Sequence, residues 1–227
     1  LKRLPRSVVV VGAGVIGIEY ASKFAALGLK VTVVDKRPRP LEFLDHEIVD
    51  ELIHQLRKVD VTFRCGDGLK SLEITGGDRK QALLELESGK FLIAEMVLIS
   101  TGRVGCTEGL GLEVVGLSAD DRGRIKTDAH FQTAVPHIYA AGDVIGYPSL
   151  AATSSEQGRL AALHMFDEET APLGDRFPIG IYSIPEISMM GETEEALTAK
   201  KVPYETGIAR YNETARGQIL GDHSGMF

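Results

Sequence analysis

The sequence contains only two cysteines, Cys65 and Cys106, and they lie far apart in the chain. They form neither a CxxC nor a CxxxxC pair, and we expect both thiols to be reduced and inert. The six histidines show no HxxxH or HExxH spacing. The sequence therefore offers no recognisable zinc site, and we predict no metal.

Acidic residues outnumber basic ones, and long hydrophobic runs are lacking. Lysine and arginine number 25 against 32 aspartates and glutamates, which gives a net charge of −7. This balance argues against binding to nucleic acid or to an anionic membrane surface. No apolar run approaches the roughly 20 residues that span a bilayer, and no secretory signal opens the chain, so we expect a cytoplasmic protein.

The chain opens with the pattern of a strand, a helix and a second strand. Residues 7–12 form an unbroken apolar run of β-branched residues, typical of a parallel strand covered on both faces. Residues 14–27 follow as a predicted helix, and residues 31–35 as the next strand. Small residues at helical spacing predict a narrow face that lies close to the sheet: Gly17, Ala21, Ala25 and Gly28. Together these segments predict a right-handed βαβ unit.

Further segments extend this α/β pattern. Asp45 is a suitable N-cap for a second helix. The apolar stripe of that helix is formed by Ile48, Leu52 and Leu56. Residues 61–64 resemble a third parallel strand, residues 69–91 alternate like an antiparallel meander, and residues 96–99 return to the buried-strand pattern. The sequence thus predicts a Rossmann-like, three-layer βαβ domain with an antiparallel meander.

The second half of the chain has a different pattern. Residues 138–141 predict one more buried strand, and residues 149–166 predict a long helix. Pro172 and Pro178 indicate a boundary, after which another unit begins. Residues 215–220 look like the beginning of a sheet.

The segment Gly12-Ala-Gly-Val-Ile-Gly17 is a G-x-G-x-x-G between a predicted strand and a predicted helix. Its first glycine permits a tight turn, Gly14 lets a pyrophosphate approach the backbone, and Gly17 lets the helix pack on the strand. Asp35 lies about 20 residues on, where an acidic residue holds a ribose 2′-hydroxyl. The pattern predicts a nicotinamide dinucleotide site; the alternative is a structural turn with a surface aspartate.

The choice between NAD and NADP depends on three consecutive residues. Asp35 would repel a 2′-phosphate by about 4 kcal/mol if two unit charges lay ~4 Å apart at an effective dielectric of about 20. Lys36 and Arg37 follow directly, and either would offset that repulsion by turning toward the phosphate. The alternative is a solvated pair of cations. NAD is therefore the electrostatic default, and use of both nucleotides stays open.

Two weaker motifs follow strands in the second half. Residues 100–103, Ser-Thr-Gly-Arg, come directly after the strand at 96–99, and Gly102 would let a ligand come close. Residues 137–144 run from a strand into Gly142-Asp143, shortly before the predicted helix. A carboxylate beside helix N–H groups suits a polyol and nearby anionic groups, whereas the alternative is a plain turn.

Taken together, these motifs resemble the FAD-dependent pyridine nucleotide–disulfide oxidoreductase family. In that family, residues 12–19 correspond to the nicotinamide-nucleotide fingerprint and residues 101–103 to the return to the flavin domain. Residues 141–144 correspond to the second flavin motif, and residues 182–188 with 191–194 to the opening of the interface domain. The resemblance runs along the whole chain, with the motifs in the family's order.

The resemblance implies roles for individual residues. Glu19 would lie beside the nicotinamide, Leu69 near the adenine, and Asp143 would hold the ribitol chain. Four residues would lie against the flavin: Ser149, Leu150, Ala151 and Ala152. The other residues assigned to cofactor binding are Gly12, Gly14, Val15, Ile16, Gly17, Asp35, Lys36, Arg37 and Gly102. The implied cofactors are FAD, NAD and NADP.

Four stretches most resemble members that move hydride between NADPH and NAD⁺ through FAD: residues 18–22, 102–108, 143–151 and 215–219. That hydride step needs no acid–base residue, so we name no catalytic side chain. One alternative is a flavin disulfide reductase such as a dihydrolipoamide dehydrogenase. Another is a nucleotide-binding module that has no turnover by itself.

The resemblance also implies a division into domains and a homodimer. Residues 1–117 would bind NAD(P), residues 118–172 would complete a FAD-binding domain, and residues 173–227 would begin an α+β interface domain. A complete member opens with its own flavin G-x-G-x-x-G and ends with a histidine-bearing tail, and this chain shows neither. We therefore expect about half of a family member, which by itself lacks turnover.

Overall fold

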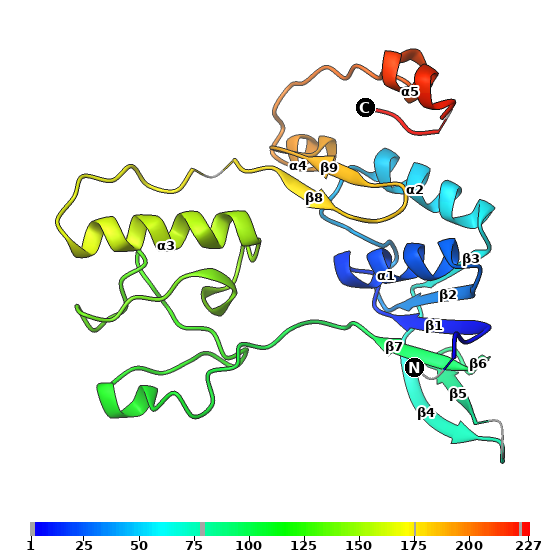
Figure 1. Cartoon of the computed structure of the whole chain (residues 1–227), viewed down its shortest axis with the longest axis horizontal. Helices are drawn as coiled ribbons and strands as arrows, with labels where there is room; N and C mark the ends of the chain where they lie inside the picture. Colours follow the sequence, from blue (N-terminus) through cyan, green and yellow to red (C-terminus); the bar gives the residue numbers. More distant parts are fainter. Residues whose placement is uncertain (1–2, 78–79, 175, 223) are drawn as a thin grey trace. The chain divides into compact units, whose positions relative to one another are not determined.

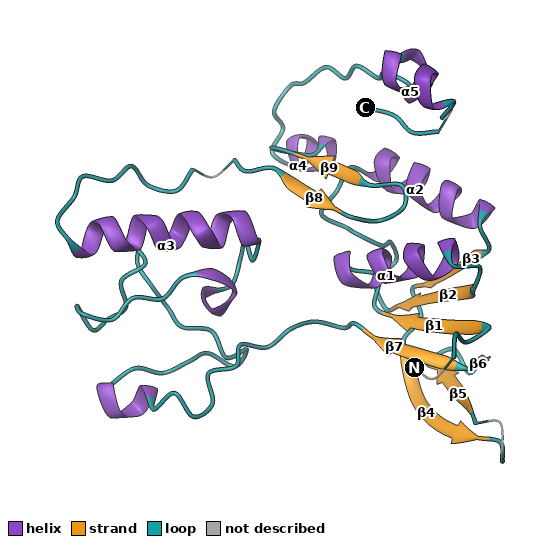
Figure 2. Ribbon diagram, viewed as in Figure 1, coloured by secondary structure: helices purple, strands orange, loops and turns teal. Residues whose placement is uncertain are grey.

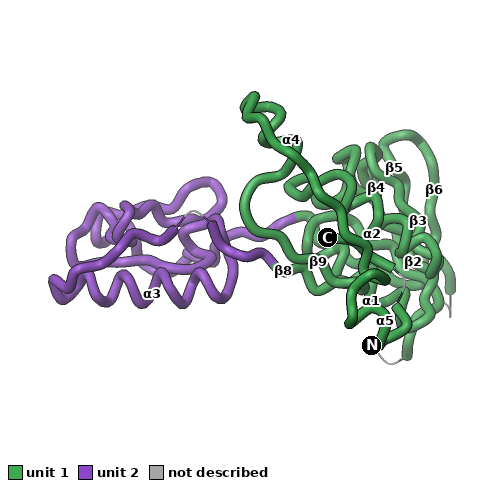
Figure 3. Tube along the Cα trace, turned by 90° about the horizontal axis from the view of Figure 1, so that it is seen from above, with its two compact units in different colours: residues 1–101, 180–227 green, residues 102–179 purple. Residues whose placement is uncertain are grey.

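A computed structural model describes residues 3–77, 80–174, 176–222 and 224–227 (Figure 1). The chain divides into two compact units, one of residues 1–101 with 180–227 and the other of residues 102–179 (Figure 3). The predicted nucleotide-binding fingerprint lies in the first unit, and the predicted flavin motif lies in the second. The functional domain boundaries at residues 117 and 172 stay a prediction.

A parallel sheet forms the centre of the first unit, as the sequence predicted. Its strands, in spatial order, are β3 (Val61–Cys65), β2 (Lys30–Asp35), β1 (Ser7–Val11) and β7 (Met96–Ile99). Every neighbouring pair is parallel. Helix α1 (Val15–Ala26) connects β1 to β2, and α2 (His46–Lys58) connects β2 to β3. The predicted βαβ unit and third parallel strand are confirmed.

The central sheet lies between helices and a second sheet (Figure 2). The second sheet is an antiparallel meander of β4 (Leu69–Thr75), β5 (Gln81–Leu86) and β6 (Phe91–Ala94), as predicted. One core cluster joins the two sheets: Val9, Val11 and Val34 of the parallel sheet pack with Leu84, Leu86 and Ala94 of the meander. Burial on both faces explains the unbroken apolar runs of β1 and β2.

The small-residue face of α1 is shorter than the sequence predicted. Gly17, Ala21 and Ala25 are buried, as expected, and Ser22 is buried with them. Gly28 is exposed and lies beyond the end of the helix, where its φ of +81° ends the helical path. That backbone conformation favours glycine, so Gly28 serves the turn into β2 and does not pack on the sheet.

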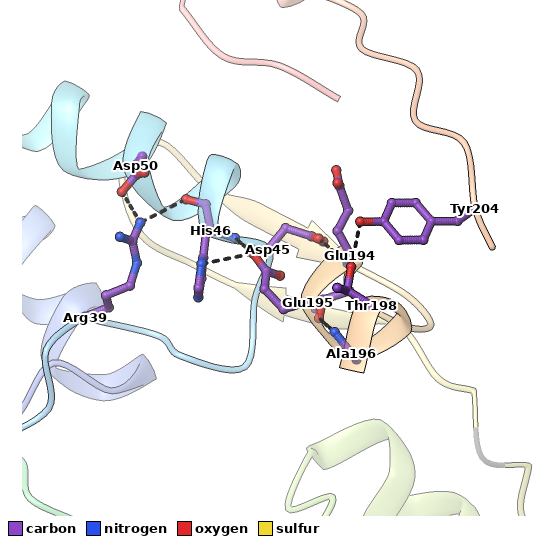
Figure 4. Close-up of polar contacts among 10 residues, drawn as sticks. Arg39, Asp45, His46, Asp50, Glu194, Glu195, Ala196, Thr198 and Tyr204 are labelled. Atoms are coloured by element: carbon purple, nitrogen blue, oxygen red, sulfur yellow. Dashed lines mark hydrogen bonds and ion pairs between the residues drawn. The ribbon is translucent and has the colours of Figure 1, made fainter. Parts of the chain in front are cut away.

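Asp45 precedes α2, as predicted, but its side chain makes no capping hydrogen bond. Its Oδ1 instead accepts from the Glu194 N–H at 2.8 Å, at the start of α4 (Glu194–Ala199) (Figure 4). The Glu195 carboxylate accepts from the His46 N–H at 3.1 Å and lies 3.1 Å from His46 Nδ1. The Asp45 carboxylate therefore accepts from Glu194, a residue distant in sequence, instead of capping α2. No local pattern predicts this contact. The buried stripe of α2 is Val49, Leu52 and Leu56, and Ile48 is half-buried.

The second unit contains α3 (Ala151–Met165), close to the predicted helix, and two short 3₁₀ helices at Leu112–Val115 and Gly142–Ile145. The predicted strand at residues 138–141 is wrong. Tyr139 makes only an isolated antiparallel bridge with Gln132. A buried strand needs backbone partners on its edges, and the described part of this unit supplies one bridge there.

The last segment contains a two-stranded sheet of β8 (Ile179–Ile181) and β9 (Ile187–Met189), and a short helix lies near its end. The predicted sheet at residues 215–220 is wrong, because these residues form α5 (Ala215–Leu220). Thr214 caps this helix by accepting from the Gly217 N–H at 3.0 Å. Among the residues with assigned positions, no helix combines the length and apolarity that crossing a membrane requires.

Candidate functional site

The glycine-rich turn is built so that two of its glycines are sterically required. Gly12 directly follows β1 with a φ of +109°, and a Cβ there would lie 2.8 Å from the Ser100 carbonyl carbon. A Cβ on Gly17 would overlap the carbonyl oxygen of Gly12 and lie 2.8 Å from Ser100 Oγ. The turn, the first turn of α1 and the end of β7 therefore meet without intervening side chains.

Among the described residues, no side chain accepts a hydrogen bond from the N–H groups at the N-terminus of α1. Gly14 occupies the N-cap position and makes no side-chain capping bond. The first intrahelical hydrogen bond runs from the Ile18 N–H to the Gly14 carbonyl at 3.0 Å. The N–H groups of Val15, Ile16 and Gly17 precede it and point out of the helix end. Backbone donors and the helix dipole together suit a phosphate group.

Asp35 lies at the end of β2, beside this turn, with its side chain only 7% exposed. Its Oδ2 accepts from the Ala13 N–H at 2.5 Å and from Arg37 Nη2 at 2.6 Å. Its Oδ1 accepts from the Arg37 N–H at 2.8 Å and from Arg37 Nε at 3.0 Å. The carboxylate is thus held in one orientation by the glycine-rich turn and by a bidentate arginine.

These contacts fix the charge of the pair. Burial alone would raise the pKa of Asp35, but the hydrogen bonds from the Arg37 side chain, the Ala13 N–H and the Arg37 N–H outweigh it and lower that pKa. The hydrogen bond to Asp35 likewise raises the pKa of Arg37. At neutral pH the site therefore holds a carboxylate and a guanidinium.

Arg37 also reaches the glycine-rich turn. A Cβ built on Gly14 would lie 3.8 Å from Arg37 Nη2, so the guanidinium lies over the turn between Asp35 and the start of α1. Lys36 is also paired: its Nζ lies 2.5 Å from Glu87 Oε1. Lys36 and Arg37, left open by the sequence as phosphate ligands or solvated cations, are thus each bound to an acid.

Two further predicted residues of the first unit lie on different elements. Glu19 of α1 is half-buried, and its Oε1 accepts from the Tyr182 N–H at 2.9 Å. Leu69 begins β4 and packs against the core between the two sheets. The sequence did not single out Ser100 as a site residue, although its motif was noted. Its Oγ donates to the Val11 or Gly12 carbonyl, at 3.0 and 3.2 Å, and so ties β7 to the turn.

The predicted flavin residues gather in the second unit around the start of α3. Asp143 is 41% exposed, and its Oδ2 lies 2.6 Å from Arg103 Nη2. The Gly142 N–H donates to the buried Gln157 side chain at 2.7 Å, which joins the 3₁₀ helix to α3. Gly102 is exposed with a φ of +138°. Arg103 belongs to the motif noted at residues 100–103, but its pairing with Asp143 was not predicted. Gln157 was not predicted, because no local pattern indicates its partner.

In the described part of the chain, the first backbone N–H groups of α3 have no hydrogen-bond acceptor. Leu150 is the N-cap and makes no side-chain capping bond, and the first intrahelical bond runs from the Ser154 N–H to the Leu150 carbonyl at 2.8 Å. Ala151 and Ala152 are exposed there, and the Ser149 hydroxyl donates to the Gly146 carbonyl at 2.7 Å. This end of α3 offers backbone N–H groups close to the 3₁₀ helix that contains Asp143.

The remaining candidate groups contribute little. Within the described ranges, no group of three or more His, Cys, Asp or Glu side chains is placed to hold a metal ion. Both cysteines are free, Cys65 half-buried and Cys106 exposed. Burial raises the pKa of the Cys65 thiol, which disfavours the reactive thiolate at neutral pH.

A family model described as pyridine nucleotide-disulphide oxidoreductase matches residues 1–158. The chain belongs to this family. The match covers the glycine-rich turn, Asp35 and the motif at Asp143. The resemblance inferred from the three motifs is therefore confirmed.

Curated members of the family are similar over the whole chain. The soluble pyridine nucleotide transhydrogenase of Mycobacterium tuberculosis is 56% identical over 226 residues, which are 100% of this chain and 48% of that protein. The protein of the same name from Chromohalobacter salexigens is 48% identical over 226 residues, with the same coverage of both chains. The chain thus spans about half the length of the curated relatives it matches.

Solved structures of related proteins share the fold. LpdA from Mycobacterium tuberculosis matches with a TM-score of 0.91 and 29% identity, over 100% of this chain and 49% of that chain. The HOCl-induced flavoprotein disulfide reductase RclA from Escherichia coli matches with a TM-score of 0.89 and 26% identity, over 100% and 52%. These likenesses confirm the predicted Rossmann-like α/β fold.

Proposed function

We propose that the first unit binds a nicotinamide dinucleotide at the start of α1. The observation that carries this proposal is the glycine-rich turn, where Gly12 and Gly17 leave no room for a Cβ and three helix N–H groups point outward. The pyrophosphate would lie on those N–H groups, and the adenosine ribose beside Asp35. Glu19 would approach the nicotinamide, and Leu69 the adenine.

We propose that the second unit contributes part of a FAD site. The exposed carboxylate of Asp143 and the uncapped start of α3 suit the ribitol hydroxyls and the polar edge of a flavin. Gly102, Ser149, Leu150, Ala151 and Ala152 would form the remaining contacts. FAD, when bound, supplies the ability to take up hydride from one nicotinamide and return it to another.

The proposed activity of the full-length protein is Si-specific transfer of hydride between NADPH and NAD⁺. Its support is the 56% identity over 226 residues to proteins named soluble pyridine nucleotide transhydrogenase. Hydride leaves C4 of NADPH and is later added to C4 of NAD⁺, which yields NADP⁺ and NADH. The residues of this chain bind and orient the nucleotides, and none acts as an acid or base.

Steady-state kinetics of the full-length protein test this activity. Because the two nucleotides would use one site in turn, we expect a ping-pong pattern, with parallel lines in double-reciprocal plots of rate against NADPH at several NAD⁺ concentrations. Lines that converge would require both nucleotides to be bound at once and would contradict the scheme.

A flavin disulfide reductase is the second candidate function. It is supported by the likeness to the flavoprotein disulfide reductase RclA at a TM-score of 0.89. Such an enzyme uses a pair of thiols, and Cys65 and Cys106 do not have CxxxxC spacing. Full-length protein that reduces a disulfide with NADH but does not exchange hydride between nucleotides would favour this candidate.

For the chain by itself we propose nucleotide binding without turnover, because the chain spans only about half the length of the transhydrogenases it matches. We also propose a cytoplasmic protein that forms a homodimer at full length. The relatives' name, soluble pyridine nucleotide transhydrogenase, supports the cytoplasmic location. The family resemblance of residues 182–188 to an interface domain supports the homodimer.

A further inference from the structure

The end of β2 is held to the loop before β4 by backbone hydrogen bonds. The Asp67 N–H donates to the Asp35 carbonyl at 3.1 Å, and the Gly66 N–H donates to the Arg37 carbonyl at 2.9 Å. Backbone hydrogen bonds therefore hold residues 35–37 against residues 66–67, the loop that leads into the meander. These bonds fix the position of residues 66–68 relative to the proposed ribose site.

The turn between β5 and β6 is hydrogen-bonded to the same loop. The Glu87 N–H donates to the Gly68 carbonyl at 2.8 Å. The Asp67 carboxylate accepts from the Ser88 N–H at 3.0 Å and from the Ser88 hydroxyl at 2.5 Å. These Ser88 hydrogen bonds contribute to lowering the pKa of Asp67, so the contact persists at neutral pH. Glu87 is thus held at a defined position relative to Lys36.

Lys36 and Glu87 meet across a glycine. Lys36 Nζ lies 2.5 Å from Glu87 Oε1, and both side chains pass over Gly68. A Cβ on Gly68 would lie 2.7 Å from Lys36 Cε and 2.7 Å from the Glu87 carboxylate. Gly68 is buried under the pair and has no side chain that would separate the two charges.

We propose that Glu87 is a specificity-determining residue that limits the binding of nucleotides with a 2′-phosphate. Glu87 holds Lys36 in an ion pair, and the 2′-phosphate of NADP(H) binds Lys36 only by displacing that carboxylate. A 2′-hydroxyl binds without displacing the Glu87 carboxylate, so the affinity for NAD(H) does not depend on Glu87. This inference rests on the nucleotide-binding role proposed above.

The charges around the site support an exchange of partners. Asp35 pairs with Arg37, and Glu87 pairs with Lys36, so two cations next to the proposed ribose position are each neutralised by an acid. A 2′-phosphate carries more negative charge than one carboxylate and offers three acceptor oxygens. A 2′-phosphate therefore competes with Asp35 for Arg37 and with Glu87 for Lys36. Each of these ion pairs must be broken before the phosphate can bind that cation, which lowers its affinity.

The test is calorimetric titration of NADP⁺ and NAD⁺ into the purified wild-type protein and its Glu87→Gln variant. The Lys36–Glu87 pair is exposed, so the expected gain is modest: about two- to fivefold tighter binding of NADP⁺, with the Kd of NAD⁺ unchanged. In a Lys36→Met background, Glu87→Gln is expected to have no effect on either nucleotide, because the cation through which Glu87 acts is gone.

The matched control is Glu85→Gln, which removes the partner of Lys70 (2.7 Å) at a position on β5 two residues before Glu87. We expect it to change neither affinity. An unchanged Kd for NADP⁺ in Glu87→Gln, or an equal change for both nucleotides, would overturn the role of Glu87 and leave nucleotide binding intact. Absence of binding by the wild-type protein would instead refute the proposed function.

Discussion

Replacement of Gly17 by alanine is expected to destabilise the first unit and to abolish most nucleotide binding. The added Cβ would overlap the Gly12 carbonyl oxygen and lie 2.8 Å from Ser100 Oγ, so α1 must move away from β1. We expect a loss of about 3 kcal/mol in the free energy of unfolding, the upper end for overpacking. For a chain of this size that lowers the Tm by about 6–12 °C.

The affinity of the Gly17→Ala variant for NAD⁺ is expected to fall at least about tenfold, because the displaced helix end no longer directs its N–H groups at the pyrophosphate. Thermal unfolding and calorimetry measure the two effects. Gly158→Ala is the matched control: Gly158 lies within α3, and a Cβ there meets nothing within 4 Å. We expect that change to stabilise the protein by about 0.5–1 kcal/mol. A Gly17→Ala variant with wild-type Tm and affinity would contradict the packing described for the turn.

Replacement of Asp35 by asparagine is expected to reduce the preference for NAD⁺ over NADP⁺ by about 10- to 100-fold. Two effects combine. A hydrogen bond to a charged acceptor is worth about 1 kcal/mol more than one to a neutral acceptor, so NAD⁺ binding weakens about fivefold. Loss of the carboxylate also removes the repulsion of a 2′-phosphate and frees Arg37, so NADP⁺ binding strengthens.

The two dissociation constants, measured by calorimetry at one ionic strength, test this prediction. Asp50→Asn is the matched control, because Asp50 also pairs with an arginine, Arg39, but lies on α2. It is expected to alter neither constant. Unchanged constants in Asp35→Asn would show that the carboxylate does not contact the ribose.

Asp35 also predicts a pH dependence of stability. Its pKa is lowered in the folded protein, so its contribution to stability is fully present above the ordinary value of 3.8 and is lost as the pH falls through the folded pKa. The Asp35→Asn variant lacks this contribution. Below about pH 4 its stability is therefore expected to depend less on pH than that of the wild type.

Local sequence patterns predicted the part of the fold that positions the nucleotide. The apolar runs at residues 7–12 and 31–35 and the glycine spacing between them predicted β1, α1 and β2. These segments are covered on both sides, so burial determined their composition directly. Burial also explains why the alternation in residues 69–91 predicted the meander. Here only one face of each strand packs on the core, so apolar and polar residues alternate.

The features that the sequence did not predict depend on contacts between distant residues. Asp45 has capping chemistry, but the Glu194 N–H is its partner. Residues 138–141 have the composition of a strand without the partners of one, and residues 215–220 form a helix through a cap at Thr214. Glu87 is an ordinary charged turn residue until the meander register brings it to Lys36. Propensity describes each segment alone, and tertiary contacts decide these cases.

The central claim is that the start of α1 binds a pyrophosphate while Asp35 binds the attached ribose. Calorimetric titration of NAD⁺ into the purified 227-residue chain tests it most directly. We predict a colourless preparation that takes up one NAD⁺ per chain, with binding weakened by Asp35→Asn. A well-folded chain that releases or absorbs no heat with NAD⁺ and none with NADP⁺ would contradict the claim.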